Sequence, residues 1–259
     1  MATESTNMAA RLSLCFLPLE IKQTILCSLS DTYALKAAIL SHSSIYSAFR
    51  DRPESIIIRV LLNSIPQDLL PDAALVLDAS TIEGWTWSNK AMSQDWTRKR
   101  VLTILSRHKN RAVPETISLN DAGSMLKFYH VVKTLTSDFI SDAMPKNPAL
   151  LQHPPSSREW NRVARSFYRF EVYRHLFRDR DNFDYGQLNE RKKSSPDFRI
   201  GEQWEVYYKN FAVWELEQLA TVGDYLFRRV AIRTSFSPYL PLSLWRHWTD
   251  LLRSLQRNR

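Results

Sequence analysis

Glycine and cysteine are scarce in this sequence, and each shortage limits the available folds. Only 5 of the 259 residues are glycine and 2 are cysteine. So few glycines disfavour a sheet with many tight turns, and apolar residues recur at spacings of three and four instead of alternating. Cys15 and Cys27 provide neither a disulfide framework nor a zinc-binding spacing. We therefore predict an all-α fold with two free thiols.

Long apolar runs are also missing. No stretch approaches the roughly 18 uninterrupted apolar residues that a membrane-spanning helix needs. The start of the chain makes a poor signal peptide, because its short apolar stretch from Leu12 to Leu19 is broken by Ser13 and Pro18. We predict a protein of the cytoplasm, the nucleus or both, without a membrane as its partner.

Signatures of catalysis are absent as well. The chain has no Gly-rich phosphate loop, no GxSxG, no HExxH and no pair of histidines at metal-ligand spacing. We expect no enzymatic activity, no cofactor and no metal site.

Apolar and basic residues are plentiful. Hydrophobic residues make up 44% of the chain and aromatic residues 12%, which is enough material for a packed core. The net charge of +8 suits an acidic partner such as nucleic acid, an acidic protein surface or an anionic membrane. Charge alone does not choose among these partners.

The first strongly periodic segment lies near the N-terminus. Pro18 can begin a helix, and apolar residues follow at helical spacing as far as Leu29. Asp31 is a suitable N-cap for a second helix, and Ser43 or Ser44 for a third. We predict a flexible stretch over residues 1–15, a helical unit over 16–80 and a helical C-terminal domain over 81–259.

Further helices are predicted along the rest of the chain. One contains Pro53 in its first turn, another ends near Ser80, and Ser157 is the expected N-cap of a long helix. Residues 81–89 lack a clear period and are predicted as a packed connection, and residues 179–199 as a polar loop. The remaining predicted helices cover about residues 90–108, 120–143, 204–209, 213–230 and 242–255.

The N-terminal segment FLPLEIKQTILCSLSDTYALKAAILSHSSIYSAF resembles an F-box in the order and spacing of its Leu-Pro pair, its glutamate, its Ile-Leu pair and its later apolar positions. Two downstream segments, FYRFEVYRHLF and FAVWELEQLATVGDYLFRRV, are similar to a large group of F-box-like proteins of filamentous fungi. The sequence after Val230 departs from the continuation of that group, which leaves a truncated or divergent C-terminal part open.

The resemblance implies a substrate adaptor. F-box helices bind the Skp-type linker of an SCF ubiquitin ligase, and the rest of the protein recruits a target for ubiquitin-dependent degradation. By the same resemblance, Leu17 and Pro18 enter the groove of the linker and Glu20 contacts its rim. The implied apolar anchors are Ile21, Ile25, Leu26 and Leu29, and the docking face or the small core behind it is completed by Leu35, Ile39 and Leu40. The target protein stays unknown, because neither leucine-rich repeats nor a WD pattern follows.

The physical argument for docking does not depend on the family. Apolar side chains at positions i, i+4, i+5 and i+8 of a helix can fill a groove on a partner. The same side chains can also form the core of so small a unit. For Ile25 and Leu29 both interpretations stay open.

Four arginines suggest an alternative function. They step by four, three and four along the predicted helix after Ser157, on a different face from its apolar stripe, so we expect them to face water or an acidic partner. With TRKR, RHKNR and RKK, they favour a basic helical nucleic-acid-binding protein as the alternative, beside an orphan protein-interaction module. These basic-face candidates are Arg158, Arg162, Arg165 and Arg169.

Overall fold

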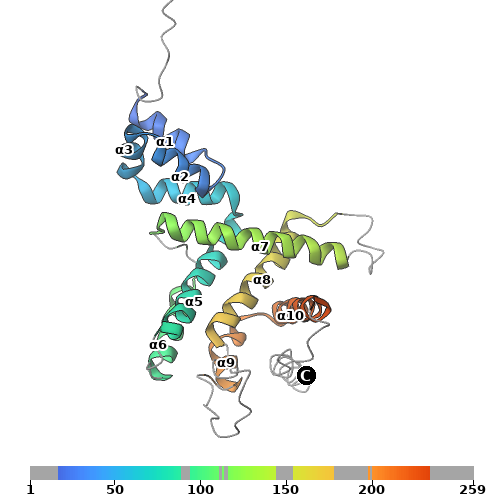
Figure 1. The fold of residues 1–259 in the computed structure, drawn as a ribbon. Helices are drawn as coiled ribbons and strands as arrows, with labels where there is room; N and C mark the ends of the chain where they lie inside the picture. Colours follow the sequence, from blue (N-terminus) through green and yellow to red (C-terminus); the bar gives the residue numbers. More distant parts are fainter. Residues whose placement is uncertain are drawn as a thin grey trace, which may run out of the picture. The chain divides into compact units, whose positions relative to one another are not determined.

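Helices make up most of the residues that the structure of this chain describes. The structure is a computed structural model, and it describes residues 17–88, 94–110, 113, 116–143, 154–177, 198 and 200–233. These residues form ten α-helices, two short 3-10 helices and no strand, which confirms the predicted all-α fold (Figure 1). The predicted flexible stretch 1–15, the polar loop near 179–199, apart from Phe198, and the helix at 242–255 lie outside the described residues.

The chain divides into two compact units, and the first is built from two separate segments. Residues 1–66 and 114–127 form the first unit, and residues 67–113 and 128–259 form the second. The boundary that we predicted near Ser80 falls inside a continuous helix.

The first unit contains four short helices and the beginning of a longer one. Helices α1 and α2 both pack against α3 and α4. The helices are α1 (Leu19–Cys27), α2 (Thr32–Ser41), α3 (Ser43–Asp51), α4 (Pro53–Ser64) and α7 (Leu119–Ala143), of which α7 continues into the second unit. Pro53 occupies the first turn of α4, as predicted.

Side-chain caps define where two of these helices begin. The Asp31 carboxylate accepts hydrogen bonds from the backbone N–H groups of Tyr33 and Ala34, each at 2.8 Å, so the predicted cap of α2 is confirmed. Helix α3 is capped by His42, whose Nδ1 accepts from the N–H of Ser44 at 3.0 Å. The prediction of a serine cap was wrong here, because the histidine ring supplies the acceptor one position earlier.

Aliphatic side chains from each of these helices form the core of the first unit. Burying one such side chain contributes about 1.5–3 kcal/mol relative to leaving it in water. The buried apolar residues are Leu26, Leu35, Ile39, Ile45, Ala48, Ile56, Ile57, Val60, Leu61 and Ile65, with Ile117, Ala122, Met125 and Leu126 from the second segment.

The second unit is organised around α8, which packs against α5 and α10. The rings of Phe139, Phe167 and Tyr225, from α7, α8 and α10, meet edge to face at centroid distances of 5.1 to 6.3 Å. The elements of this unit are η2 (Gln67–Leu69), α5 (Leu70–Ser88), α6 (Gln94–Arg107), the rest of α7, α8 (Ser157–Phe177), α9 (Ile200–Val206), η6 (Tyr208–Asn210) and α10 (Val213–Arg233).

Two predictions in this unit need correction. Helix α5 continues to Ser88, so the predicted connection over residues 81–89 is wrong. Gly84 disfavours a helix most strongly in that stretch, and one glycine costs a helix only about 1 kcal/mol relative to alanine. The cap of α8 lies one residue earlier than predicted, because Ser156 and Glu159 bond each other reciprocally in a capping box.

Candidate protein-docking surface

The residues predicted to dock a partner separate into a buried and an exposed set. Leu26, Leu35 and Ile39 lie in the core of the first unit. Ile21 is 47% exposed and Leu40 is 75% exposed. The other predicted residues lie between these extremes or at the surface: Pro18 and Glu20 are exposed, whereas Leu17, Ile25 and Leu29 are half-buried. Because Ile25 and Leu29 are half-buried, both core packing and contact with a partner remain open for them.

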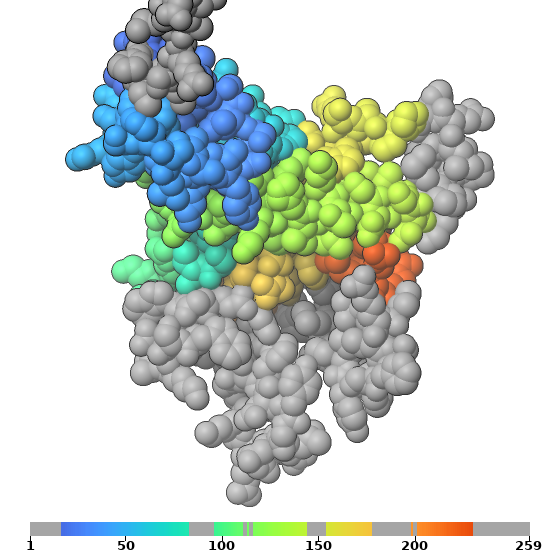
Figure 2. Space-filling view, turned by 45° about the horizontal axis from the view of Figure 1, so that its top comes forward, coloured from blue at the N-terminus to red at the C-terminus, as the bar shows by residue number. Residues whose placement is uncertain are grey.

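Contacts with α3 fix which side of α1 faces outward. The Lys22 ammonium donates to the Ser44 hydroxyl at 2.6 Å, and Lys22 is buried. The Gln23 amide donates to the Asp51 carboxylate at 2.9 Å and to the carbonyl of Ala48 at 3.3 Å. The opposite side of α1, which includes Glu20 and Ile21, is therefore left to solvent. In the space-filling view, the side chains of residues 17–66 (blue to cyan) form one continuous body (Figure 2).

Helix α2 carries apolar residues on both of its faces. Leu35 and Ile39 point into the core, whereas Tyr33 is 56% exposed and Leu40 lies seven residues further along the same exposed face. Ala37 and Lys36 are also exposed. Tyr33 was not among the predicted docking residues, although its i, i+4, i+7 spacing with Ala37 and Leu40 is a signal that the sequence already contains.

Two more large apolar side chains of the first unit were missed as surface residues. Leu19 is 41% exposed on α1 and Tyr46 is 50% exposed on α3. Together with Pro18, Ile21, Tyr33 and Leu40 they form the set that we call the exposed apolar residues of the first unit. Exposed apolar residues are normal when they are scattered singly and mark protein-binding sites when they form one contiguous patch, so these residues are the candidates for such a patch.

The arginine stripe of α8 does not lie on one solvent face. Arg158 and Arg162 are exposed, as predicted. Arg165 lies with its Nε 3.4 Å from Oδ2 of Asp72, and its guanidinium donates to the carbonyl of Asp68 at 3.2 Å. The stripe therefore faces water at its beginning and turns toward η2 and α5 further along.

Arg169 is buried, so the prediction that it faces water or an external acidic partner is wrong. It is 7% exposed, and its Nη2 donates to Oε1 of Glu215 at 2.6 Å. Its guanidinium also lies 4.6 Å from the centroid of the Phe211 ring. Burial raises the pKa of Glu215, but hydrogen bonds from the N–H of Ala212 and from Arg169 outweigh burial and hold that pKa below its ordinary value. This pair joins α8 to α10.

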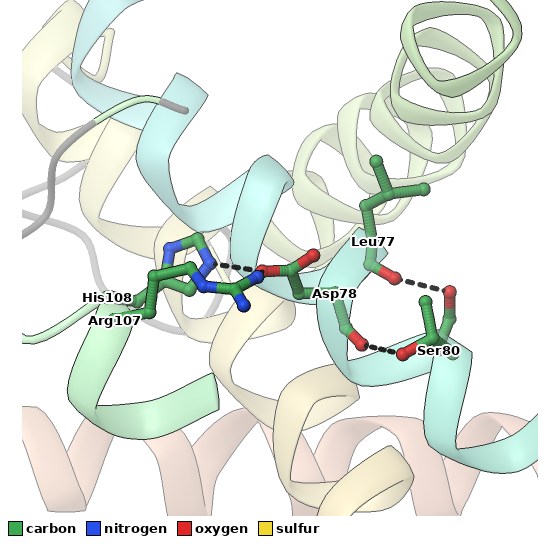
Figure 3. A network of polar contacts seen from close by, with 6 residues as sticks. Leu77, Asp78, Ser80, Arg107 and His108 are labelled. Carbon is green, nitrogen blue, oxygen red and sulfur yellow. Dashed lines mark hydrogen bonds and ion pairs between the residues drawn. The ribbon is translucent and has the colours of Figure 1, made fainter. Parts of the chain in front are cut away.

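A second ionic network joins α5 to α6 (Figure 3). Oδ2 of Asp78 lies 2.8 Å from Nε2 of His108 and accepts from Nη1 of Arg107 at 3.0 Å. Because a carboxylate only accepts, Nε2 carries the proton of this bond. The hydrogen bond from His108 is the largest influence on Asp78, and with the nearby positive charges it lowers the pKa of Asp78 despite partial burial. These contacts connect α5 to the end of α6.

Metal and membrane sites are not found in the described ranges. Among the residues that the structure describes, no three His, Cys, Asp or Glu side chains are grouped so as to hold a metal ion. Nor does any helix in those ranges have the length and apolar character to cross a bilayer. Cys27 is a half-buried free thiol whose pKa is raised by burial, and the Arg59 charge opposes this rise. Cys15 lies outside the described residues.

No protein-family model matches this chain, and no similar curated protein or solved structure was found. The likeness to F-boxes therefore rests on the residues quoted from the sequence, and the site is interpreted from its own geometry.

Proposed function

We propose that this protein is an F-box-like substrate adaptor whose N-terminal helices bind the Skp-type linker of an SCF ubiquitin ligase. The main support is that the first unit has a complete aliphatic core and still leaves large apolar residues outside it. Ile21 and Leu40, which the resemblance assigns to docking, are among those exposed residues. A fold that already contains a core does not need them for its own packing.

The energetics of docking follow from burial. Transferring one exposed Leu or Ile side chain into a partner groove is worth about 1.5–3 kcal/mol. A few such anchors account for most of the affinity of a typical protein interface. Because this contact is apolar, we expect linker binding to change little between low and high salt, whereas binding to a polyanion would weaken steeply.

The second unit is proposed to recruit the target protein. Its described residues contain no repeat or known recognition module, so the class of target stays undefined. The nucleic-acid alternative receives less support than the sequence suggested, because Arg165 and Arg169 are engaged by acidic residues of the same chain. Arg158 and Arg162 remain available to an anionic partner.

The test is direct binding of the purified chain to a purified Skp-type linker at low and high salt. The variants are a Leu17→Ala, Pro18→Ala double mutant, Ile21→Ser and Leu40→Ser. The matched control is Val213→Ser on α10, since Val213 is 57% exposed but belongs to the second unit. We expect binding that persists in high salt, is lost in the first-unit variants and is retained in the control.

Two results would contradict the proposal. One is the absence of binding by a folded wild-type chain. The other is equal loss of binding in the Val213→Ser control, which would mean that the contact is nonspecific. Salt-sensitive binding to a DNA or RNA oligonucleotide, lost in an Arg158→Ala, Arg162→Ala double mutant, would favour the nucleic-acid alternative.

A further inference from the structure

The connection between α1 and α2 leaves several backbone carbonyls without helical partners. Helix α1 ends at Cys27 and α2 begins at Thr32, and the last carbonyls of any helix lack intrahelical donors. The N–H of Ser28 bonds back to Thr24 and Ile25, at 3.1 Å each. The carbonyls of Cys27, Leu29 and Ser30 point instead toward donors from a different helix.

Those donors come from the last turn of α4. The side-chain amide of Asn63 donates to the carbonyl of Cys27 and to that of Leu29, each at 2.8 Å. The next residue, Ser64, donates its hydroxyl to the carbonyl of Ser30 at 2.6 Å. Two adjacent side chains thus bond three carbonyls of a connection that lies 34 to 36 residues earlier in the chain.

The last turn of α4 is itself firmly placed. Val60 and Leu61 are fully buried just before Asn63, and Ile65 is fully buried just after Ser64. Helix α1, by contrast, has only nine residues, and isolated helices shorter than about 12 residues are marginal in water. The end of α1 therefore depends on tertiary contacts, and α4 supplies them.

We propose that Asn63 and Ser64 are positioning residues for partner docking. They hold the end of α1 and the connection to α2 in one conformation, and so fix how the exposed apolar residues of both helices are presented. The docking unit then includes α4 and does not end with the third helix. The binding part of this inference rests on the proposed function, whereas the ordering of the connection does not.

The test uses the full chain and a purified Skp-type linker as the probe. Asn63→Asp keeps the size of the side chain but removes both of its donated hydrogen bonds. Ser64→Ala is the milder change, because it removes only the third hydrogen bond. Ser55→Ala, an exposed position on the first turn of α4, is the control. Association and dissociation rates are measured together with hydrogen exchange at the amides of Ser28 and Leu29.

A positioning role has a specific kinetic signature. If the connection is ordered in only a fraction of the molecules, the association rate falls in proportion to that fraction, while the dissociation rate of the formed complex stays unchanged. We expect Asn63→Asp to slow association roughly tenfold and Ser64→Ala to slow it less, with faster exchange at Ser28 and Leu29 in both. The control should match the wild type.

The opposite results are equally clear. Wild-type association and wild-type exchange in Asn63→Asp would overturn the proposal. Faster dissociation with unchanged exchange would also overturn it, because Asn63 would then touch the linker directly. If the wild-type chain does not bind the linker, the proposed function fails, and the exchange measurement alone decides whether α4 orders the connection.

Discussion

Individual side chains of α1 have opposite surroundings although they share one apolar pattern. Ile21 and Leu26 are both apolar, five positions apart and assigned to docking by the family resemblance, yet one is exposed and the other is buried. Spacing alone could not separate them, because the chain carries apolar residues on more than one side of α1 and on both faces of α2. Only the packing of α3 and α4 against these helices identifies which of the apolar residues are exposed.

This difference predicts separable effects of two substitutions. Leu26→Ala removes a buried side chain and is expected to lower the free energy of unfolding by about 2–5 kcal/mol. Ile21→Ala should change it by no more than about 0.5 kcal/mol, because surface substitutions cost little. Urea unfolding checks both values. A large destabilisation by Ile21→Ala would mean that this side chain belongs to the core.

The buried Arg169 predicts a large effect at the residue scale. Replacing Arg169 by methionine leaves the Glu215 carboxylate without its main partner, and breaking such a pair typically costs about 3–5 kcal/mol. The double variant with Glu215→Leu removes the unpaired charge, so we expect it to be more stable than the single one. Thermal unfolding of the three proteins measures the difference. Equal stability of the single and double variants would contradict a buried, coupled pair.

At the scale of helices, sequence patterns predicted which helices exist better than where each helix begins and ends. The helix that begins after Asp31 and the long helix over residues 120–143 were both found where the apolar period placed them. The caps were less predictable, because the acceptors came from a histidine ring just before α3 and from a serine just before α8, one residue earlier than predicted. The continuation of α5 was missed because a glycine beside two tryptophans resembles a break when tertiary packing is unknown.

The junction of α5 and α6 predicts a pH dependence of stability. The folded pKa of Asp78 lies below its ordinary value, so its contribution is fully present above the unfolded pKa of about 4 and is lost as the pH falls toward the folded pKa. We expect the free energy of unfolding to decline in acid, and to decline less in Asp78→Asn. Urea unfolding at several pH values tests this. The control is Ser55→Ala, an exposed position on α4 that carries no titratable group, which should keep the wild-type slope.

At the scale of the whole molecule, the all-α class followed from composition and period, but the division into units did not. The first unit takes residues 114–127 from beyond the segment that we assigned to it. No local pattern indicates this, because Met125 and Leu126 belong to a single uninterrupted helical period. Which unit a helical turn joins is decided by contacts between residues far apart in the chain.

This arrangement predicts the behaviour of a fragment. A chain cut after residue 66 lacks Ile117, Ala122, Met125 and Leu126, all of which are buried in the complete protein. We expect the fragment to keep much of its helical circular dichroism but to unfold with little cooperativity. Adding residues 114–127 through a short flexible linker should restore a sharp transition. Equally sharp unfolding of both fragments would show that the second segment is dispensable.

The discontinuous first unit also has a consequence for synthesis on the ribosome. Residues 17–66 leave the exit tunnel before residues 67–113, and the segment 114–127 that completes their unit follows only after both have been made. Throughout that interval the nascent chain holds an unfinished core beside its exposed apolar residues, a surface that chaperones recognise. The first segment of this unit therefore waits for a later segment of the chain before its core is complete.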